Sequence, residues 1–179
     1  TAGDDFEIPE TFDPIGAITI GHRTTTDGLP GSPSVRPRKA QADVPYRFVP
    51  DLAGLAAESD FLIVACPGGA ATRNIVDAKV LAALGKKGIV VNIARGSIVD
   101  EPALVAALQN GTIKGAGLDV FADEPNVPAP LLAMENVVLL PHVGSATRET
   151  RQAMGDLCKA NLDAWFAGKP LLTLIPELG

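Results

Sequence analysis

The sequence predicts an α/β fold built on an open, doubly wound parallel sheet, and two observations predict it. Four short runs rich in Val, Ile and Leu are apolar along their whole length rather than at alternate positions. Uniform apolarity is typical of parallel strands that helices cover on both faces. Helix-sized segments separate the runs, which indicates crossover connections between parallel neighbours.

Each expected element has local support in the sequence. The strands are expected at 61–65, 88–92, 113–121 and 136–140. A helix in the segment 76–88 has Asp77 as its N-cap and Gly85 as its stop, and a helix in 100–111 has Asp100 as its cap and Gly111 as its end. A longer helix is expected after Ser145, because apolar residues there recur at intervals of three and four. This stripe consists of Met154, Leu157, Cys158, Leu162, Trp165 and Phe166, and we expect Cys158 to be buried in it.

Composition excludes several classes of protein. The chain has 179 residues, of which 46% are hydrophobic and 20% charged, with a formal net charge of -6. This length and apolar content suit a folded domain, whereas an acidic chain is a poor partner for nucleic acid or an anionic membrane. The opening TAGDDFEIPE has neither the basic start nor the apolar stretch of a signal peptide. We therefore expect a cytoplasmic protein, and the sequence predicts no metal site.

The domain organisation is expected to follow a change of texture near Pro45. Residues 1–44 carry no sustained periodicity and are expected to be irregular. Residues 45–150 are expected to form the latter part of a dinucleotide-binding domain. Residues 151–179 are expected to form a C-terminal helix and a tail that would return to a substrate domain.

Polar residues cluster just after the expected strands. Ligands of an open parallel sheet bind beyond the carboxyl ends of its strands, so these residues are candidates for a site. An arginine, Arg95, follows the second strand, and His142 follows the fourth. Two acids stand at the end of the third strand, Asp119 and then Glu124. Arg can bind a carboxylate in two places and His can transfer a proton near neutral pH. The set suits the reduction of a 2-oxo acid by hydride from a nicotinamide.

Four motifs in order resemble those of the D-isomer-specific 2-hydroxyacid dehydrogenases. They are SDFLIVACPGGAATRNIVD, KKGIVVNIARGSIVDEPALVAAL, GAGLDVFADEPNVP and NVVLLPHVGSATRETRQAM, and their wording is closest to the glyoxylate/hydroxypyruvate reductase branch. The resemblance covers roughly Val35 to Pro176. It implies a Rossmann-like fold, NADP as cofactor with NAD as the alternative, a small 2-oxo acid such as glyoxylate or hydroxypyruvate as substrate, and a homodimer.

The resemblance also implies roles for single residues. Arg95 would bind the substrate carboxylate and keto oxygen, His142 would be the general acid–base, and Glu124 would hydrogen-bond His142 and favour its protonated form. Asp119 would contact the nicotinamide carboxamide. The other implied cofactor contacts are Cys66, Pro67, Thr72, Ile93, Ala94 and Gly144, with Arg36, Arg38 and Lys39 reading the 2′-phosphate of NADP.

Some of these residues have an equally simple structural explanation. Cys66 is as well suited to packing as to contacting a cofactor, and Glu124 before Pro125 could be a turn residue. Arg36, Arg38 and Lys39 could be a solvated run of charge.

The chain departs from the family at its start. It contains no G-x-G-x-x-G, the glycine loop that lets a backbone approach a pyrophosphate. The segment IGAITIGHR could be a faint echo of that first strand or could be the second strand. The expected fold is therefore incomplete, with its first glycine-loop unit not recognisable. The alternative function is a catalytically silent, truncated nucleotide-binding or interaction module.

Overall fold

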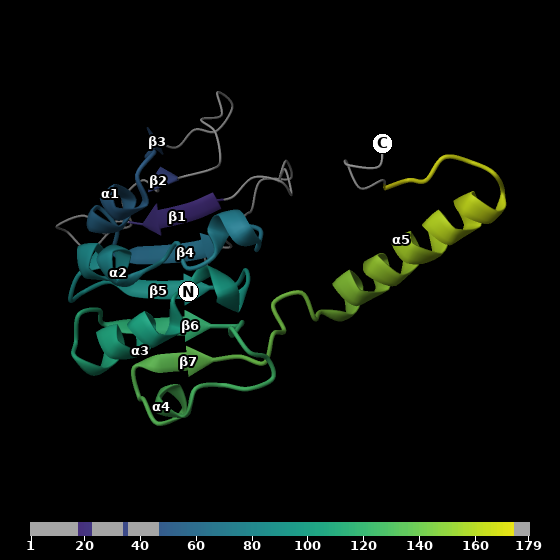
Figure 1. The fold of residues 1–179 in the computed structure, drawn as a ribbon. Helices are drawn as coiled ribbons and strands as arrows, with labels where there is room; N and C mark the ends of the chain where they lie inside the picture. Colours follow the sequence, from purple (N-terminus) through teal and green to yellow (C-terminus); the bar gives the residue numbers. More distant parts are fainter. Residues whose placement is uncertain (1–17, 23–33, 36–46, 174–179) are drawn as a thin grey trace, which may run out of the picture. The chain divides into compact units, whose positions relative to one another are not determined.

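The computed structural model describes residues 18–22, 34–35 and 47–173, the first two ranges as backbone. The chain divides into two compact units, Thr1–Pro141 and His142–Gly179, and each is described by itself. The first unit holds a sheet of order β3-β2-β1-β4-β5-β6-β7 (Figure 1).

The parallel half of the sheet matches the four expected strands. It comprises β4 (Phe61–Ala65), β5 (Ile89–Asn92), β6 (Gly115–Leu118) and β7 (Val137–Leu139). Each pairs in parallel with the next. The third strand is shorter than predicted, since Asp119 to Phe121 lie beyond the paired residues. The parallel α/β arrangement is therefore confirmed.

The other half of the sheet differs from what the sequence predicted. The strand β1 (Ile18–His22) runs antiparallel to β4, and β2 (Ser34–Val35) runs antiparallel to β1. The short β3 (Arg47–Phe48) is parallel to β2. Because β1 opposes β4, AITIGHR is neither a parallel first strand nor a parallel second strand. Two strands thus lie within residues 1–44, which the sequence predicted to be irregular, because partner strands and not local periodicity define them.

Helix caps explain where the helices of the first unit begin. Helix α1 (Leu52–Ala57) is capped by Asp51, α2 (Ala78–Leu84) by Asp77 and α3 (Glu101–Gln109) by Asp100. In each, the cap carboxylate accepts a hydrogen bond from a backbone N–H in the first turn. Gly85 ends α2 with a φ of 78°, a left-handed value that glycine adopts at little cost. A single turn, α4 (Ala129–Leu132), precedes β7.

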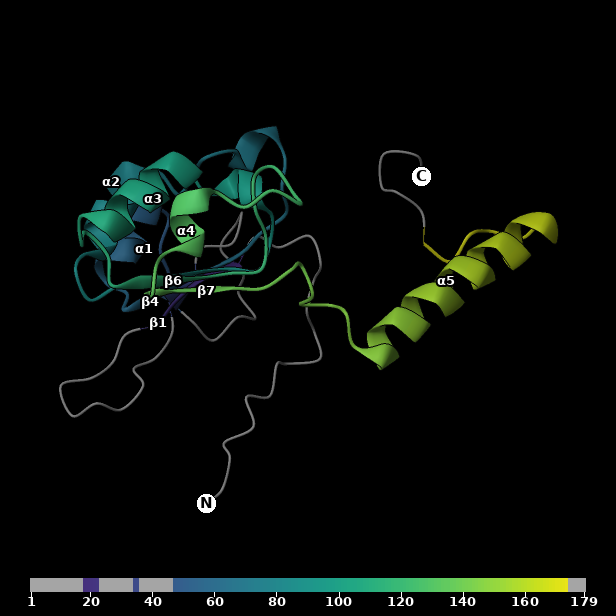
Figure 2. The same cartoon turned by 90° about the horizontal axis from the view of Figure 1, so that it is seen from below.

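The core lies between the sheet and one layer of helices. Figure 2 shows α1, α2, α3 and α4 on the same face of the sheet. The burial of β4 agrees with this arrangement. Leu62 and Val64, which share one face of the strand, are buried, whereas Phe61, on the opposite face, is exposed. Within the first unit, these four helices thus cover one face of the sheet. Uniformly apolar strands indicate that both faces of the sheet are apolar, but they do not indicate which element covers each face.

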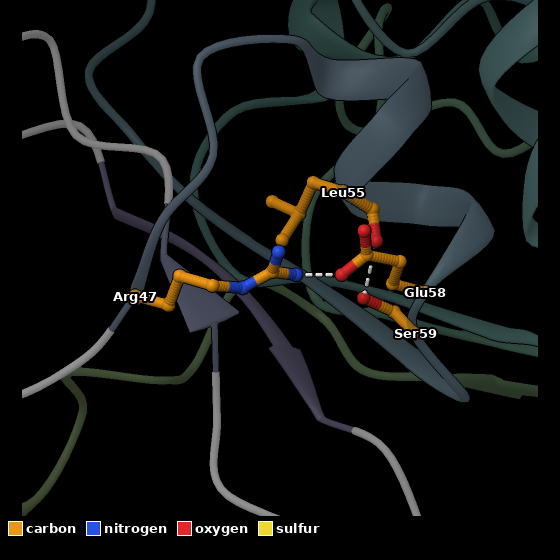
Figure 3. A network of polar contacts seen from close by, with 4 residues as sticks. All are labelled: Arg47, Leu55, Glu58 and Ser59. Carbon is orange, nitrogen blue, oxygen red and sulfur yellow. Dashed lines mark hydrogen bonds and ion pairs between the residues drawn. The ribbon is translucent and has the colours of Figure 1, made fainter.

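A polar contact ties the edge of the sheet to the first helix. The guanidinium of Arg47 on β3 forms an ion pair with Glu58, the residue that ends α1 (Figure 3). The neighbouring Ser59 donates from its hydroxyl to the carbonyl of Leu55, 2.6 Å away. The ion pair is well exposed, so it contributes at most about 1 kcal/mol to the free energy of unfolding.

The second unit consists mainly of α5 (Arg148–Phe166), which the sequence predicted after Ser145. Its apolar stripe is largely exposed, with Trp165 and Phe166 among the exposed residues. Cys158 is exposed as well, so the expectation of a buried Cys158 is wrong: periodicity marks a stripe but does not bury it. The carboxylate of Asp163 accepts a hydrogen bond from Lys159 and raises the pKa of that lysine. Within the described residues, no helix is long and apolar enough to cross a membrane.

The Asp100 cap gives a first test of the fold. Its Oδ1 lies 3.1 Å from the N–H of Ala103, and α3 buries Leu104, Ala107 and Leu108. We expect Asp100→Ala to lower the free energy of unfolding by about 1 kcal/mol. Urea unfolding measures this change, and Asp100→Ser, which keeps an acceptor, should restore most of it. Equal stability of the Ala and Ser variants would contradict the cap's contribution.

Candidate active site at the carboxyl edge of the sheet

The strand ends of the parallel sheet are aligned. Val64 pairs with Asn92, Asn92 with Leu118, and Leu118 with Leu139, so these residues form one row across four strands. The loops that follow β4, β5 and β6 therefore leave the sheet side by side. All the candidate residues of the first unit except Arg36, Arg38 and Lys39 lie in these three loops.

A buried asparagine shapes the turn that carries Arg95. Asn92 is 1% exposed, and its side-chain amide uses both ends. Its Oδ1 accepts from the N–H of Ala94 at 3.0 Å, and its Nδ2 donates to the carbonyl of Arg95 at 3.0 Å. These bonds close residues 92–95 into a compact turn. Because a buried amide left unpaired is costly, the clamp also fixes the turn energetically.

The arginine side chain leaves this turn toward the loop after β4. Its Nη1 donates to the carbonyl of Ala94 at 2.6 Å, and the side chain is exposed at the sheet edge. A Cβ built on Gly68 would lie 2.9 Å from Cγ of Arg95, so the glycine allows the β4 loop to pack on the arginine stem. The exposed guanidinium retains donors for a carboxylate.

The hydroxyl of Thr72 braces the loop after β4. It donates to the carbonyl of Pro67 at 2.8 Å. Cys66 is buried in the core while Pro67 is exposed. The structure therefore supports the packing explanation for the Cys66 side chain, and Pro67 and the backbone of the loop are what the edge presents.

The loops after β5 and β6 touch through their backbones. A Cβ on Gly96 would lie 1.9 Å from the carbonyl carbon of Phe121 and 2.3 Å from the nitrogen of Ala122. Glu101, in the first turn of α3, accepts from that Ala122 N–H at 2.7 Å through its Oε1. The arginine-bearing turn and the acidic loop are thus held against each other here.

The acidic loop carries the two predicted acids in different surroundings. Asp119 is 4% exposed at the end of β6, and its N–H donates to the carbonyl of Asn92 at 3.0 Å. Glu124 is exposed, and its Oε1 accepts from the N–H of Phe121 at 3.0 Å. Glu124 therefore does close a turn, as the simple explanation suggested, and that turn presents its carboxyl group at the surface.

Ile93 is the other candidate residue of the β5 loop with an exposed side chain. Its side chain is 54% exposed, whereas the neighbouring Ala94 is buried. An exposed branched aliphatic side chain at a ligand-binding edge offers a flat apolar surface to a ring.

The second unit begins with the predicted general acid–base. His142 is exposed and has a φ of 55°, a left-handed value that is uncommon for residues other than glycine. Such backbone outliers cluster at functional sites. Gly144 follows two residues later and is also exposed.

Arg36, Arg38 and Lys39 lie outside the described residues. Val35, immediately before them, ends the strand β2. Among the residues that the structure describes, no group of three or more His, Cys, Asp or Glu side chains could hold a metal ion.

Sequence reasoning missed three residues that build this edge: Asn92, Gly96 and Glu101. Each had a signal in the sequence. Asn92 is a polar residue that ends an apolar strand, Gly96 directly follows the candidate Arg95, and Glu101 is a second acid beside the helix cap. None of these signals names its partner, because Glu101 and Ala122 are far apart in the sequence.

The fold and this edge define a Rossmann-like dinucleotide-binding unit. Residues 30–144 match the family model of the D-isomer specific 2-hydroxyacid dehydrogenase, NAD binding domain. The chain therefore belongs to the D-isomer specific 2-hydroxyacid dehydrogenase family, as its motifs suggested.

Similar proteins agree with this assignment. The chain is 55% identical over 136 residues to glyoxylate/hydroxypyruvate reductase A HPR2 of Arabidopsis thaliana, covering 76% of the chain and 44% of that protein. It is 50% identical over 134 residues to 2-ketogluconate reductase of Gluconobacter oxydans, covering 75% and 43%.

A solved structure is also similar. It is the NADPH-dependent glyoxylate/hydroxypyruvate reductase of Sinorhizobium meliloti in complex with NADP and malonate, with a TM-score of 0.76 and 54% sequence identity. The match covers 78% of the present chain and 44% of the Sinorhizobium meliloti reductase chain. The chain thus spans less than half the length of the relatives it matches.

Proposed function

We propose that the protein carrying this chain reduces a small 2-oxo acid, such as glyoxylate or hydroxypyruvate, to the D-2-hydroxy acid with NADPH. The observation that carries the proposal is the exposed Arg95, on a turn clamped by Asn92 and beside the acidic loop at the carboxyl edge of the sheet. The names of the similar reductases support this substrate class.

The residues at the edge fit a nicotinamide cofactor. The exposed Ile93 offers an apolar surface to the ring, and the carboxylate of Asp119 at the end of β6 is an acceptor suited to a carboxamide. The loop of Pro67, Gly68 and Gly69 presents backbone rather than bulky side chains, and a Cβ on Gly69 would meet no atom within 4 Å. A reduced nicotinamide supplies a hydride when bound.

Three side chains would then divide the remaining chemistry. Arg95 binds the carboxylate of the substrate and polarises its keto oxygen. His142 donates a proton to that oxygen as it gains negative charge. Glu124 would accept a hydrogen bond from the imidazole and orient it. These roles follow from the motifs NIARG, FADEP and LLPHVGSAT.

The proposal extends to cofactor choice and organisation. We propose that Arg36 and Arg38 bind the 2′-phosphate of NADP, supported by their position after β2 and by the NADPH-dependent relative. We also propose residues 45–150 as the cofactor-binding part and 151–179 as the return toward a substrate domain. The proposal also includes a cytoplasmic location, on the grounds of the composition, and a homodimer, on the grounds of the family resemblance.

Arg95→Gln tests the proposal on the intact protein. We expect kcat/KM for hydroxypyruvate to fall by roughly 100-fold or more, because each hydrogen bond to a charged group contributes about 1.5–3 kcal/mol. NADPH oxidation measures turnover, and quenching of NADPH fluorescence measures cofactor binding, which should change little. The control is Lys114→Gln, which removes a positive charge beside the amino end of β6, the opposite edge of the sheet.

The same assay decides between the two function classes. Turnover by the wild type that Arg95→Gln abolishes would eliminate the silent-module alternative. NADPH binding without turnover would favour a silent binding module. A wild type with neither turnover nor NADPH binding would refute the proposed reductase.

A further inference from the structure

We propose that Glu101 is a positioning residue that fixes the acidic loop, and with it Glu124, relative to the Arg95 turn. The inference rests on the proposed reductase function for its catalytic consequence. The contact itself is the hydrogen bond from Ala122 N–H to Glu101 Oε1, 2.7 Å long, between residues of α3 and of the loop after β6.

The acidic loop needs such a restraint. Its first residue, Asp119, still donates from its N–H to the carbonyl of Asn92, but residues 120–124 lie beyond the pairing of the sheet. Glu124 accepts from Phe121 within the same loop. A bond inside the loop fixes its shape but not its placement. Glu101 accepts from the residue after Phe121, so it anchors that shape to α3.

The anchor itself is rigid. Glu101 is half-buried and is the first residue of α3, directly after the Asp100 cap. The helix is packed through Leu104, which is 1% exposed. A carboxylate in the first turn of a helix is also favoured by the helix dipole, so Glu101 can hold the acceptor in place at little cost.

The arginine turn is held separately. The side-chain amide of Asn92 closes the turn at Ala94 and Arg95, and neither of these two hydrogen bonds involves Glu101. Loss of the Glu101 acceptor should therefore displace the acid and leave the carboxylate-binding arginine in place. This separation predicts a split between kcat and KM.

The test compares Glu101→Ala with Glu101→Gln in the intact protein. We expect the Ala variant to lower kcat for hydroxypyruvate by roughly 10- to 100-fold, because misplacing a catalytic group by about 1 Å costs this much. KM for hydroxypyruvate should stay within about threefold. The Gln variant keeps an oxygen acceptor for Ala122 N–H and should restore most of kcat. A merely structural role would not give this split together with the rescue.

A matched control removes an exposed carboxylate elsewhere in the same unit. Glu135 lies beside the amino end of β7, at the opposite edge of the sheet. Glu135→Ala should leave both kcat and KM for hydroxypyruvate unchanged. Wild-type turnover with an unchanged kcat in Glu101→Ala would overturn the positioning role while leaving the reductase proposal intact.

A second measurement does not depend on activity. Amide NMR of the chain should show changed resonances and faster hydrogen exchange at residues 119–124 in Glu101→Ala, but not in Glu101→Gln. If the wild type lacks turnover, the reductase proposal fails, and this measurement still tests the placement of the loop. Unchanged resonances at 119–124 in Glu101→Ala would overturn the inference.

Discussion

Gly96→Ala is expected to damage both the stability and the site of this protein. The added Cβ would lie 1.9 Å from the carbonyl carbon of Phe121 and 2.0 Å from its oxygen. Overpacking of this kind typically costs about 1–3 kcal/mol, and here the obstacle is backbone rather than a side chain that can rotate away. The loops that carry Arg95 and Glu124 must therefore move apart.

The measurements are urea unfolding and turnover of hydroxypyruvate by the intact protein. We expect a lower midpoint of unfolding and a loss of kcat/KM larger than that of Glu101→Ala, because both loops are displaced. The control is Gly155→Ala in α5, where a Cβ meets no atom within 4 Å. That change should be neutral or should stabilise the helix by up to about 1 kcal/mol. Wild-type stability in Gly96→Ala would disprove the close backbone contact.

Replacing His142 is expected to remove most of the chemistry without unfolding the protein. A general acid contributes about 10²- to 10⁴-fold to rate, so kcat should fall by this order. His142→Asn is the informative variant, because asparagine tolerates the left-handed backbone that His142 adopts, at a φ of 55°. The loss of activity then reports the imidazole and not the backbone.

The controls for His142→Asn separate binding from catalysis. NADPH binding and the unfolding midpoint should stay close to those of the wild type, because the side chain is exposed. Added imidazole should restore part of kcat if a missing proton donor is the defect. Full activity of His142→Asn would exclude His142 as the general acid.

Much of the parallel half of the fold could be predicted from the sequence. The run 61–65 coincides with β4, and Asp77, Gly85 and Asp100 mark helix boundaries as predicted. These features are local: a cap or an apolar run acts through its own neighbours. The antiparallel direction of β1 could not be predicted, because its pairing with β4 joins segments about 40 residues apart and nothing in the local sequence names that partner.

The site divides in the same way. The positions of Arg95, Asp119 and Glu124 after strand ends follow from topology, which sequence can predict. The supports of these residues do not: the amide clamp of Asn92 and the reach of Glu101 to Ala122 depend on the geometry of two loops. The roles assigned to the three catalytic side chains stay predictions until the variants are measured.

The contact at Gly96 also restricts how its loss could be repaired. The atoms that a Cβ would meet belong to the main chain of Phe121 and Ala122, which every residue type shares. No single substitution at those two positions can create room for the extra carbon. In a genetic selection starting from Gly96→Ala, we therefore expect recovery by reversion to glycine or by a change of loop length, and not by replacement of Phe121 or Ala122.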